Sequence, residues 1–498
     1  MTTSIPEKNS THIISIESVT AKGFGIGKLN GFTIFVEGGL PGDNLKIHIT
    51  KAKSHYGYGK IIDILEPSPH RKASPCPVSD RCGGCQWQHA EYEAQLEYKK
   101  QIVIDALERI GGIKSPPVLD VMGMLKPTNY RNKAVFPVVP ASNEHGFAIG
   151  MFSPRSHRIV EVDNCLIQHP AHIAVLKVVK KFMRRNNITP YNEITHKGIM
   201  RFVMIRTSLA TKEVMVVLTI NSNGLPHEMR LAEDLEKIGV TTVVISRNTS
   251  KNNLVLGDHF RVISGSGYIK ERIGHVEYQI SAPSFFQINP VQTKGLYEIA
   301  TRQAITPTTS IPTNISTSEI APQSIEKSSK KISESELFFK RINELKTKKK
   351  PTIIDAHVGA GGVSLYAARN ATNILGVDIV EAAIEDGKKN AELNGITNLS
   401  FICGAAEDII PPMLEQDPLT CPQVIFLDPP RKGCDPSLLD AIISAKIQHI
   451  VYISCDPATF ARDVKILVAG GYNLLVVQPV DMFPHTGKVE VSAVLQRM

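Results

Sequence analysis

The sequence predicts a multidomain chain: a small N-terminal β-barrel, a central α+β domain with a four-cysteine cluster, and a C-terminal doubly wound α/β domain. Three observations predict it. Short apolar runs separated by Gly and Pro-Gly turns fill residues 9–67, a group of cysteines follows, and strand and helix patterns alternate from residue 351 to the end. Closely spaced strands favour a barrel, whereas a repeated strand–helix–strand pattern favours a parallel sheet covered by helices.

The barrel is expected over residues 9–67, where apolar runs such as residues 33–36 alternate with turns such as the Pro-Gly-Asp at 41–43. Between the later strands, cationic and aromatic side chains mix, at Lys51, Lys53, His55, Tyr56, Tyr58 and Lys60. Such an OB-like surface suits single-stranded nucleic acid, because bases stack on rings while cations meet phosphates. A solvated hairpin is the alternative.

The central domain is expected over residues 68–290 and contains four cysteines that suggest a metal site. Three lie close together around a Gly-Gly pair and one lies far downstream, at Cys76, Cys82, Cys85 and Cys165. Four thiolates satisfy a tetrahedral metal or a cubic iron–sulfur cluster. The spacing alone does not separate zinc from iron–sulfur, and thiols without a metal are a further alternative.

The rest of this domain has a mixed pattern. A helix is predicted over residues 91–110, because it contains repeated apolar residues and two glycines follow it. Three strand-like runs and one more helix complete an α+β pattern, at residues 204–206, 214–220, 243–246 and 227–238.

The C-terminal domain is expected over residues 291–498, with strands that alternate with helices and a late hairpin. The strands are predicted at residues 352–355, 374–378, 399–402, 424–427 and 449–453, and the hairpin at 474–477 and 489–495. A Ser/Thr/Pro-rich run and a charged, lysine-rich stretch within residues 305–350 predict a low-complexity insertion that is disordered or mobile.

Two strand ends predict a cofactor site. The sequence Asp-Ala-His-Val-Gly-Ala-Gly-Gly at residues 355–362 follows the first strand of the C-terminal domain, and Asp378 ends the second. Glycines let the backbone approach a ligand, and an acidic residue about 20 positions later typically holds ribose hydroxyls. This pattern fits NAD and S-adenosylmethionine equally well.

A later strand end carries Cys455, after the apolar run at residues 450–453, and Asp428-Pro429-Pro430 lies a short way upstream. Open α/β sheets place their chemistry at the carboxyl ends of their strands. The thiol is therefore a candidate nucleophile if something lowers its pKa. For the cysteine taken alone, a buried structural thiol is the alternative.

Together these motifs resemble the bacterial RNA uracil-5-methyltransferases, in particular the ribosomal-RNA type with a TRAM domain and a [4Fe–4S] cluster. In such families an acidic residue precedes Pro-Pro, which separates them from dehydrogenases. The resemblance covers nearly the whole chain, apart from the first ten residues and the insertion. It implies a TRAM barrel and cluster ligands at Cys76, Cys82, Cys85 and Cys165.

The resemblance also implies roles for single residues. Cys455 corresponds to the nucleophile, Glu490 to the general base and Asp428 to the aspartate that orients the substrate, and Phe285 is expected near the target base. Contacts with S-adenosylmethionine are implied for Gln287, His357, Gly359, Gly361, Gly362, Asp378 and Asp428. The expected reaction is methylation of carbon 5 of a uridine in 23S ribosomal RNA, through a covalent bond between Cys455 and carbon 6.

Some positions depart from the family pattern. His357 and Val358 stand where an aromatic residue and Cys or Ser are usual, Gly362 replaces Thr or Asn, and Ala405 replaces an acid that would contact adenine. These changes motivate an alternative, an RNA-binding or ribosome-assembly protein with weak or no methyltransferase activity. A tRNA uridine methyltransferase is a second alternative. Ribosomal RNA is preferred, because the tRNA enzymes generally lack the barrel and the cluster.

Composition sets the remaining expectations. A net charge of +8 and a pI of about 8.9 are compatible with a polyanionic partner. The first ten residues are polar, so no secretory signal is expected. The sequence has no apolar run of about 18 residues, so no membrane span is expected either. Eight cysteines without a signal peptide indicate a reducing compartment. We expect a cytoplasmic monomer that acts on RNA and needs no protein partner.

Overall fold

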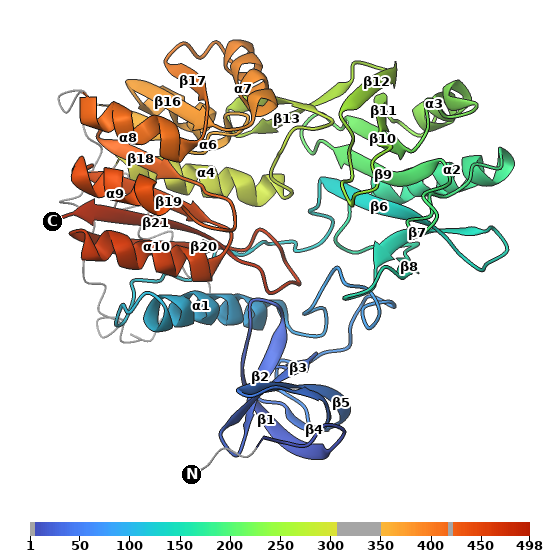
Figure 1. Ribbon diagram of the computed structural model, residues 1–498, viewed down its shortest axis with the longest axis horizontal. Coiled ribbons are helices and arrows are strands. Elements are labelled where there is room, and N and C mark those ends of the chain that lie inside the picture. Colours follow the sequence, from blue (N-terminus) through green and yellow to red (C-terminus); the bar gives the residue numbers. More distant parts are fainter. Residues whose placement is uncertain (1–4, 306–349, 417–421) are drawn as a thin grey trace, which may run out of the picture. The chain divides into compact units, whose positions relative to one another are not determined.

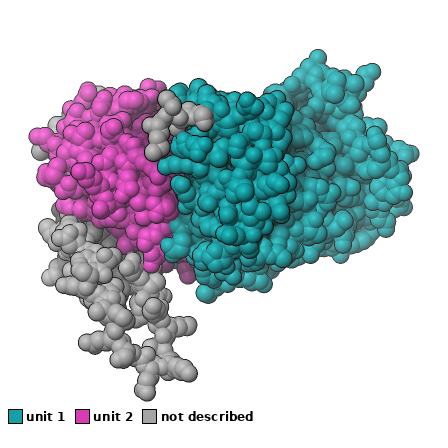
Figure 2. All heavy atoms as spheres, turned by 90° about the horizontal axis from the view of Figure 1, so that it is seen from below, with its two compact units in different colours: residues 1–98, 124–293, 482–487 teal, residues 99–123, 294–481, 488–498 magenta. Residues whose placement is uncertain are grey.

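A computed structural model describes residues 5–305, 350–416 and 422–498. The chain forms two compact units: the first takes residues from 1–98, 124–293 and 482–487, and the second from 99–123, 294–481 and 488–498 (Figure 2). Residues 306–349 of the expected insertion lie outside the described part of the chain. Within the described part, no helix combines the length and the apolar character that a membrane crossing requires.

Five strands of the first unit close into the predicted β-barrel, in the order β1-β2-β3-β5-β4 (Figure 1). They are β1 (Thr11–Val19), β2 (Phe24–Leu29), β3 (Phe32–Glu37), β4 (Asn44–Ala52) and β5 (Tyr56–Glu66). Alternate side chains such as Ile34, Val36 and Leu45 are fully buried and fill the interior. Gly27 lets β1 approach closely, because a Cβ there would lie 2.4 Å from the Ser15 carbonyl oxygen.

A buried carboxylate joins the barrel to the segment that follows it. Asp43 accepts hydrogen bonds from the N–H groups of Leu40 at 2.7 Å and Ser68 at 2.8 Å, and it pairs with Arg71. Burial alone would raise the pKa of Asp43, but these hydrogen bonds and the Arg71 charge hold it below its ordinary value. The carboxylate therefore stays ionised and ties the turn before β4 to the residues after β5.

The first unit also contains a seven-stranded sheet in the order β12-β11-β10-β9-β6-β7-β8. Its strands are β6 (Lys133–Pro140), β7 (Phe147–Phe152), β8 (Ile159–Glu161), β9 (Met200–Thr207), β10 (Val214–Ile220), β11 (Thr242–Arg247) and β12 (His259–Ser264). Helices α2 (Pro170–Arg185) and α3 (Glu228–Glu236) share one buried core with β6, β9, β10 and β11, so they cover one face. A hairpin of β13 (Tyr268–Ile273) and β14 (Val276–Ser281) follows.

The second unit is built on a seven-stranded sheet in the order β17-β16-β15-β18-β19-β21-β20, which confirms the predicted doubly wound fold (Figure 1). Its strands are β15 (Thr352–Asp355), β16 (Asn373–Asp378), β17 (Leu399–Cys403), β18 (Val424–Leu427), β19 (His449–Ser454), β20 (Tyr472–Val480) and β21 (Glu490–Arg497). The first five strands are parallel. The late hairpin joins them with β21 inserted antiparallel between β19 and β20.

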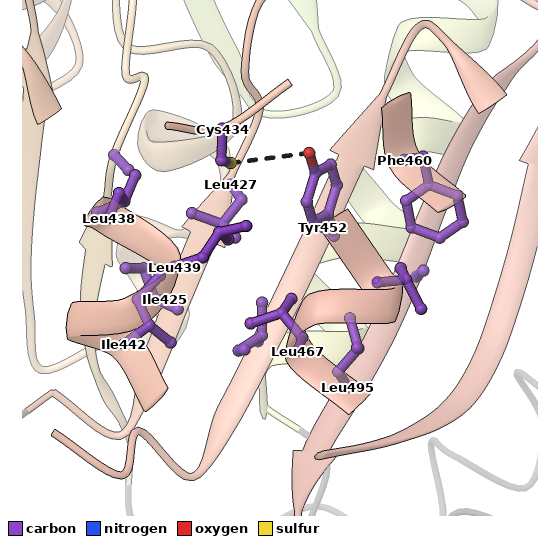
Figure 3. Packing of buried hydrophobic residues seen from close by; sticks show 14 of the residues in the cluster. Ile425, Leu427, Cys434, Leu438, Leu439, Ile442, Tyr452, Phe460, Leu467 and Leu495 are labelled. Atoms are coloured by element: carbon purple, nitrogen blue, oxygen red, sulfur yellow. Dashed lines mark hydrogen bonds between the residues drawn. The ribbon is translucent and has the colours of Figure 1, made fainter. Parts of the chain in front are cut away.

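Helices cover both faces of this sheet. They are α4 (Pro290–Ile305), α6 (Gly362–Ala367), α7 (Glu381–Leu393), α8 (Ala406–Gln416), α9 (Pro436–Ser444) and α10 (Pro457–Ala469). Helices α8, α9 and α10 share one core with the strands, and Figure 3 shows Leu438 of α9 and Phe460 of α10 on either side of Tyr452. On the opposite face, Gln303 of α4 accepts a hydrogen bond from the Ser492 hydroxyl of β21 at 2.6 Å.

Helix α1 (Tyr92–Arg109) is the predicted helix after the cysteines, and its second half belongs to the second unit. Val103 and Leu107 are fully buried in the core formed with α8, α9 and α10. Conversely, residues 482–487 return to the first unit. The periodicity of a sequence shows which face of a helix is apolar, but it does not show which sheet that face will meet.

Candidate active site

Three ionisable side chains gather at the carboxyl edge of the second sheet. Asp428 and Cys455 directly follow β18 and β19, which are adjacent parallel strands. In the antiparallel pair of β19 and β21, Ser454 lies opposite Val491. The next position in the same register sets Cys455 opposite Glu490. The edge lies beside the switch point between β15 and β18, where open α/β sheets bind ligands.

These groups change one another's ionisation. Burial raises the pKa of Asp428 well above its ordinary value, and Glu490 and Asp355 raise it further. Burial raises the pKa of Glu490 to about 7 against the opposing charge of Arg431. The pKa of Cys455 rises to about 11 through burial and then through Glu490 and Asp428, while Arg431 lowers it. Their charges therefore lie within electrostatic range of one another.

Without a ligand, acidic side chains outnumber cationic ones at this edge of the sheet. With a pKa near 11, Cys455 is a thiol at neutral pH, and the thiol is a far weaker nucleophile than the thiolate. Arg431, which hydrogen-bonds to the sulfur, is the cationic group beside it. A ligand that brings positive charge would lower the pKa of Cys455, by the Coulombic effect opposite to that of Asp428 and Glu490. The arrangement suits a cationic cofactor.

A buried carboxylate holds the loop that carries Asp428 and Arg431. Asp463 of α10 is fully buried and accepts hydrogen bonds from the Cys434 N–H at 2.8 Å and from the Tyr452 hydroxyl at 2.6 Å. The Cys434 thiol in turn lies 3.7 Å from the same hydroxyl (Figure 3). The end of the loop is thereby fixed to both β19 and α10.

The same loop is held a second time by Arg462, which pairs with Asp463 and donates to the Lys432 carbonyl oxygen at 3.0 Å. Arg431, Arg462 and Asp463 were not among the residues predicted from the sequence. Asp463 could have been found from the sequence, because it lies at helical spacing on the face of α10 that also buries Phe460 and Leu467. An acid on an apolar helical face indicates a buried partner.

The glycine loop after β15 is fixed by the acidic residue expected to hold ribose. Gly359 and Gly361 have positive φ angles of 54° and 92°, a conformation that favours glycine. The Asp378 carboxylate accepts hydrogen bonds from the N–H groups of Gly359 and Val380, each at 2.9 Å. A Cβ on Gly359 would meet no atom within 4 Å. The backbone of the loop is therefore open to a ligand on that side.

Two other expected cofactor residues lie in this loop. Burial lowers the pKa of His357 to about 4, so its ring is neutral at pH 7, and its buried Nδ1 has no hydrogen-bond partner in the described part of the chain. Such an orphaned atom fits a site that is completed by a polar ligand. At Gly362 a Cβ would lie 2.6 Å from the Tyr297 hydroxyl oxygen, so Thr or Asn does not fit there.

The remaining substrate and cofactor candidates, Phe285 and Gln287, belong to the first unit. They lie in the segment after β14, where Asn132 donates to the Gln287 carbonyl oxygen at 2.9 Å and Arg206 donates to the carbonyl oxygen of Ser284. The Phe285 side chain is 73% exposed. A large exposed ring on a tethered segment is suited to contact with a ligand.

The four cysteines of the first unit affect one another's ionisation. Burial raises the pKa of Cys85 to about 11, and Cys165 and Cys82 raise it further. Burial also raises the pKa of Cys82 and of Cys165; Cys76 adds to both rises, while Arg131 opposes them. Thiols beside an arginine fit a cluster with net negative charge. In residues 5–305, 350–416 and 422–498, however, no three His, Cys, Asp or Glu side chains are placed to hold a metal ion, and the cluster stays a prediction.

The aromatic and cationic surface expected on the barrel borders a cavity of about 1050 Å³. Phe35, Tyr56 and Tyr58 line it and pack together, with ring centroids 5.5 to 5.8 Å apart. The Lys53 ammonium lies 5.2 Å from the centre of the Tyr56 ring. Half-buried rings beside cations form a surface on which bases can stack.

The chain is similar in sequence to known protein families and to known RNA methyltransferases. Residues 331–498 match the family of tRNA (uracil-5-)-methyltransferases, and residues 7–62 match the TRAM domain. An uncharacterized RNA methyltransferase of Halalkalibacterium halodurans is 40% identical over 98% of this chain and 97% of its own. One of Clostridium tetani is 38% identical over 97% of this chain and 96% of its own.

A solved structure shares the fold over nearly the whole chain. The tRNA (uracil-54, C5)-methyltransferase of Pyrococcus abyssi, in complex with S-adenosyl-L-homocysteine, superposes with a TM-score of 0.70 at 24% identity. The match covers 97% of this chain and 100% of that chain. At this identity the likeness establishes the arrangement of strands and helices.

Proposed function

The chain belongs to the RNA methyltransferase family, with a TRAM domain and a tRNA (uracil-5-)-methyltransferase domain, and we propose that it transfers a methyl group from S-adenosylmethionine to carbon 5 of a uridine in RNA. The observation that carries this proposal is the grouping of Cys455, Glu490 and Asp428 at one edge of the second sheet. The reaction needs a nucleophile, a base and a group that orients the ring, and these residues supply all three.

In the first step Cys455 adds to carbon 6 of the uracil ring. Carbon 5 is otherwise a poor nucleophile, and the new sulfur–carbon bond moves an electron pair toward it. The step requires the thiolate, so the thiol proton must be lost. When bound, S-adenosylmethionine supplies both the methyl group and a positive charge. That positive charge lowers the pKa of Cys455, because it offsets the effect of Asp428 and Glu490, which raise it.

Carbon 5 then takes the methyl group from the sulfonium sulfur, which keeps the electron pair of the broken bond as S-adenosyl-L-homocysteine leaves. The ring is left saturated at carbons 5 and 6. Glu490 removes the proton from carbon 5, the double bond reforms and Cys455 leaves as a thiolate. A carboxyl with a pKa of about 7 is suited to this role, because it is a stronger base than an exposed glutamate and is still partly ionised at neutral pH.

Asp428 orients the ring. Burial raises its pKa well above the ordinary value, and in its protonated form the carboxyl can both donate and accept a hydrogen bond. The edge of uracil offers an N–H donor next to a carbonyl acceptor, and a protonated carboxyl complements that pair. The target base must leave the stack of the RNA before it can meet Asp428, and Phe285 is proposed as the ring on which it rests.

The direct test is a covalent trap. RNA that contains 5-fluorouridine should form a stable adduct with the wild-type protein in the presence of S-adenosylmethionine, because fluorine cannot be removed from carbon 5 as a proton. Cys455→Ala should form no adduct and transfer no methyl group to unmodified RNA. Turnover by Cys455→Ala would refute the nucleophile assignment.

A second candidate function is RNA binding with little or no methyl transfer. It is favoured by Ala405, which follows β17 where the family has an acid. Calorimetric titration of the folded protein with S-adenosylmethionine separates the two candidates. A measurable dissociation constant supports the enzyme, whereas no binding supports the second candidate.

The proposed substrate is 23S ribosomal RNA, because the barrel and the four cysteines resemble the ribosomal-RNA type. A tRNA is the competing substrate, since the P. abyssi enzyme is a tRNA methyltransferase by name. Mass mapping of 5-methyluridine in both RNAs, from cells with and without the gene, decides between them. The modified nucleoside should disappear from large-subunit RNA alone.

The cysteines Cys76, Cys82, Cys85 and Cys165 are proposed to bind a [4Fe–4S] cluster with a structural role. Their thiol-only donor set and the nearby Arg131 support this choice over a free-thiol group. The protein purified under anaerobic conditions should be brown and should bleach in air. A colourless protein with one zinc per chain would refute the cluster.

A further inference from the structure

Two cations face each other across strands β6 and β9 of the first unit. In their antiparallel pairing, Lys133 lies directly opposite Arg206. Side chains in directly opposed positions share one face of a sheet, with Cβ atoms about 5 Å apart, and like charges there are destabilising. Sequences usually place an opposite charge or a neutral residue at such a position, so this pair requires an explanation.

The pair lies on the face of the sheet away from α2 and α3. The neighbouring residues Ala134 and Ile205 pack into the core shared with those helices, and alternate residues of a strand point to opposite faces. Arg206 is 3% exposed and Lys133 is half-buried. Burial and the charge of Arg206 lower the pKa of Lys133 to about 8. The fold therefore holds a second positive charge where the local environment opposes it.

The two cations have different partners. Arg206 donates to the carbonyl oxygen of Ala282 at 3.3 Å and to that of Ser284. Within the described part of the chain no carboxylate pairs with the charge of Lys133, and an anion from outside would be stabilised there by both cations.

The position of this pair relative to Phe285 indicates what the anion is. Arg206 holds the Ser284 carbonyl just before Phe285, and Asn132, the residue next to Lys133, holds the Gln287 carbonyl just after it. The exposed ring is thus tethered on both sides, by Arg206 of β9 and by the residue just before β6. A ring that can stack on a base and a cation that can meet a phosphate together match one nucleotide.

We propose that Lys133, with Arg206 opposite it, binds a phosphate of the RNA segment whose base contacts Phe285. This inference rests on the proposed function, because it names the phosphate contact of the same RNA site. It accounts for the unfavourable pairing: the positive charge is held ready for a polyanion, and phosphate binding releases counterions from the RNA. If Lys133 had only a structural role, we would expect it to stabilise the sheet and not to oppose Arg206.

The test compares Lys133→Met with wild type in the binding of a fluorescent oligouridylate of about 12 nucleotides, followed by anisotropy over a range of salt concentrations. Loss of one phosphate contact should weaken binding about tenfold and reduce the slope of log affinity against log salt by about 0.7. Lys133→Arg should keep most of the affinity and the slope. The matched control is Lys177→Met, which removes an exposed lysine from α2 in the same unit.

Thermal unfolding separates a binding role from a structural one. Because the substitution removes a half-buried charge that opposes Arg206, Lys133→Met should raise the melting temperature while it weakens RNA binding. A lower melting temperature in Lys133→Met, or a folded variant with an unchanged salt slope, overturns the inference.

The outcome is distinguishable from failure of the proposed function, because the anisotropy assay needs no methyl transfer. A wild-type protein that binds the oligouridylate with a Lys133-dependent slope but methylates no RNA would support this inference and refute the enzyme. A protein that methylates RNA with the same slope in Lys133→Met would refute this inference alone.

Discussion

At the scale of single residues, Glu490 shows the conflict between burial and chemistry most clearly. It is 5% exposed, and its pKa is raised from 4.5 to about 7. A buried carboxyl without a full ion pair costs stability once it ionises. Strongly shifted ionisation of this kind is typical of functional sites, where the fold accepts an unfavourable charge.

The proposed role of Glu490 as general base predicts a trapped intermediate. With Glu490→Gln, sulfur addition and methyl transfer can proceed, but the proton on carbon 5 has no base to take it. The protein should therefore remain covalently bound to methylated RNA, as a complex that survives denaturing electrophoresis. The double variant with Cys455→Ala should show no complex. Absence of the complex in Glu490→Gln alone would mean that Glu490 acts before the sulfur adds.

The same shift predicts how stability depends on pH. Between about pH 4.5, where the unfolded glutamate ionises, and about pH 7, where the folded one does, the folded state binds more protons. The contribution of Glu490 to the free energy of unfolding therefore falls as pH rises through this window. Glu490→Gln should be more stable than wild type by about 3 kcal/mol at pH 8 and similar to it at pH 4. Urea unfolding at both pH values measures the difference, and equal stability at pH 8 would contradict the raised pKa.

At the scale of elements, the loop after β18 depends on Asp463 of α10. Asp463→Ala would remove the acceptor of the Tyr452 hydroxyl and of the Cys434 N–H, and it would remove the carboxylate partner of Arg462. We expect a loss of about 3 kcal/mol in the free energy of unfolding, because buried donors lose a charged partner. Tyr452→Phe removes one of these hydrogen bonds and should cost about 1 kcal/mol.

The loop also positions Asp428 and Arg431, so kcat should fall in Asp463→Ala even at temperatures where the variant is fully folded. Tyr452→Phe serves as the control, since Asp463 still accepts the hydrogen bond from the Cys434 N–H. Chemical denaturation and single-turnover methylation measure the two effects. A destabilised variant with wild-type kcat would show that Asp463 supports the fold and has no effect on the position of the loop.

The helices and strands themselves were largely predictable from the sequence, but which strands pair with one another in the sheet was not. The strands before Asp428 and Cys455 are continuous apolar runs, which is typical of strands buried on both faces of a parallel sheet. The position of Glu490 beside Cys455 requires β21 to insert antiparallel between β19 and β20. Pairing between strands that are distant in sequence leaves no periodic signal in either strand. Family resemblance, rather than pattern, indicated Glu490.

At the scale of the whole molecule, the two units exchange segments. Residues 99–123 leave the first unit to pack in the second, and residues 482–487 return from the second to the first. Lys99 and Asp481 are the residues of the second unit that stand next to two of these crossings. Their side chains form an ion pair, and both are fully buried. A linear division of the sequence cannot reveal such an exchange, since composition and turn signals do not change at the crossing points.

The division of chemistry between the units leads to the last prediction. The aromatic residues Tyr56 and Tyr58 line the barrel cavity in the first unit, whereas Cys455 and Glu490 lie in the second. If the barrel surface holds RNA by stacking, loss of both rings should weaken binding without changing the chemical step. Stacking contributes about 1–3 kcal/mol per base, which corresponds to a KM for RNA about 5 to 150 times higher for each base that loses its ring.

The double variant Tyr56→Ala/Tyr58→Ala should therefore show wild-type kcat at saturating RNA and a raised KM, as measured by methyl transfer at several RNA concentrations. Ile62→Ala is the matched control, because Ile62 is 53% exposed on the same strand β5 and does not line the cavity. The control should leave both constants unchanged, since it removes apolar surface without a stacking ring. A fall in kcat with an unchanged KM would exclude the barrel as a binding surface, because a residue that only holds RNA stabilises the bound and transition states equally.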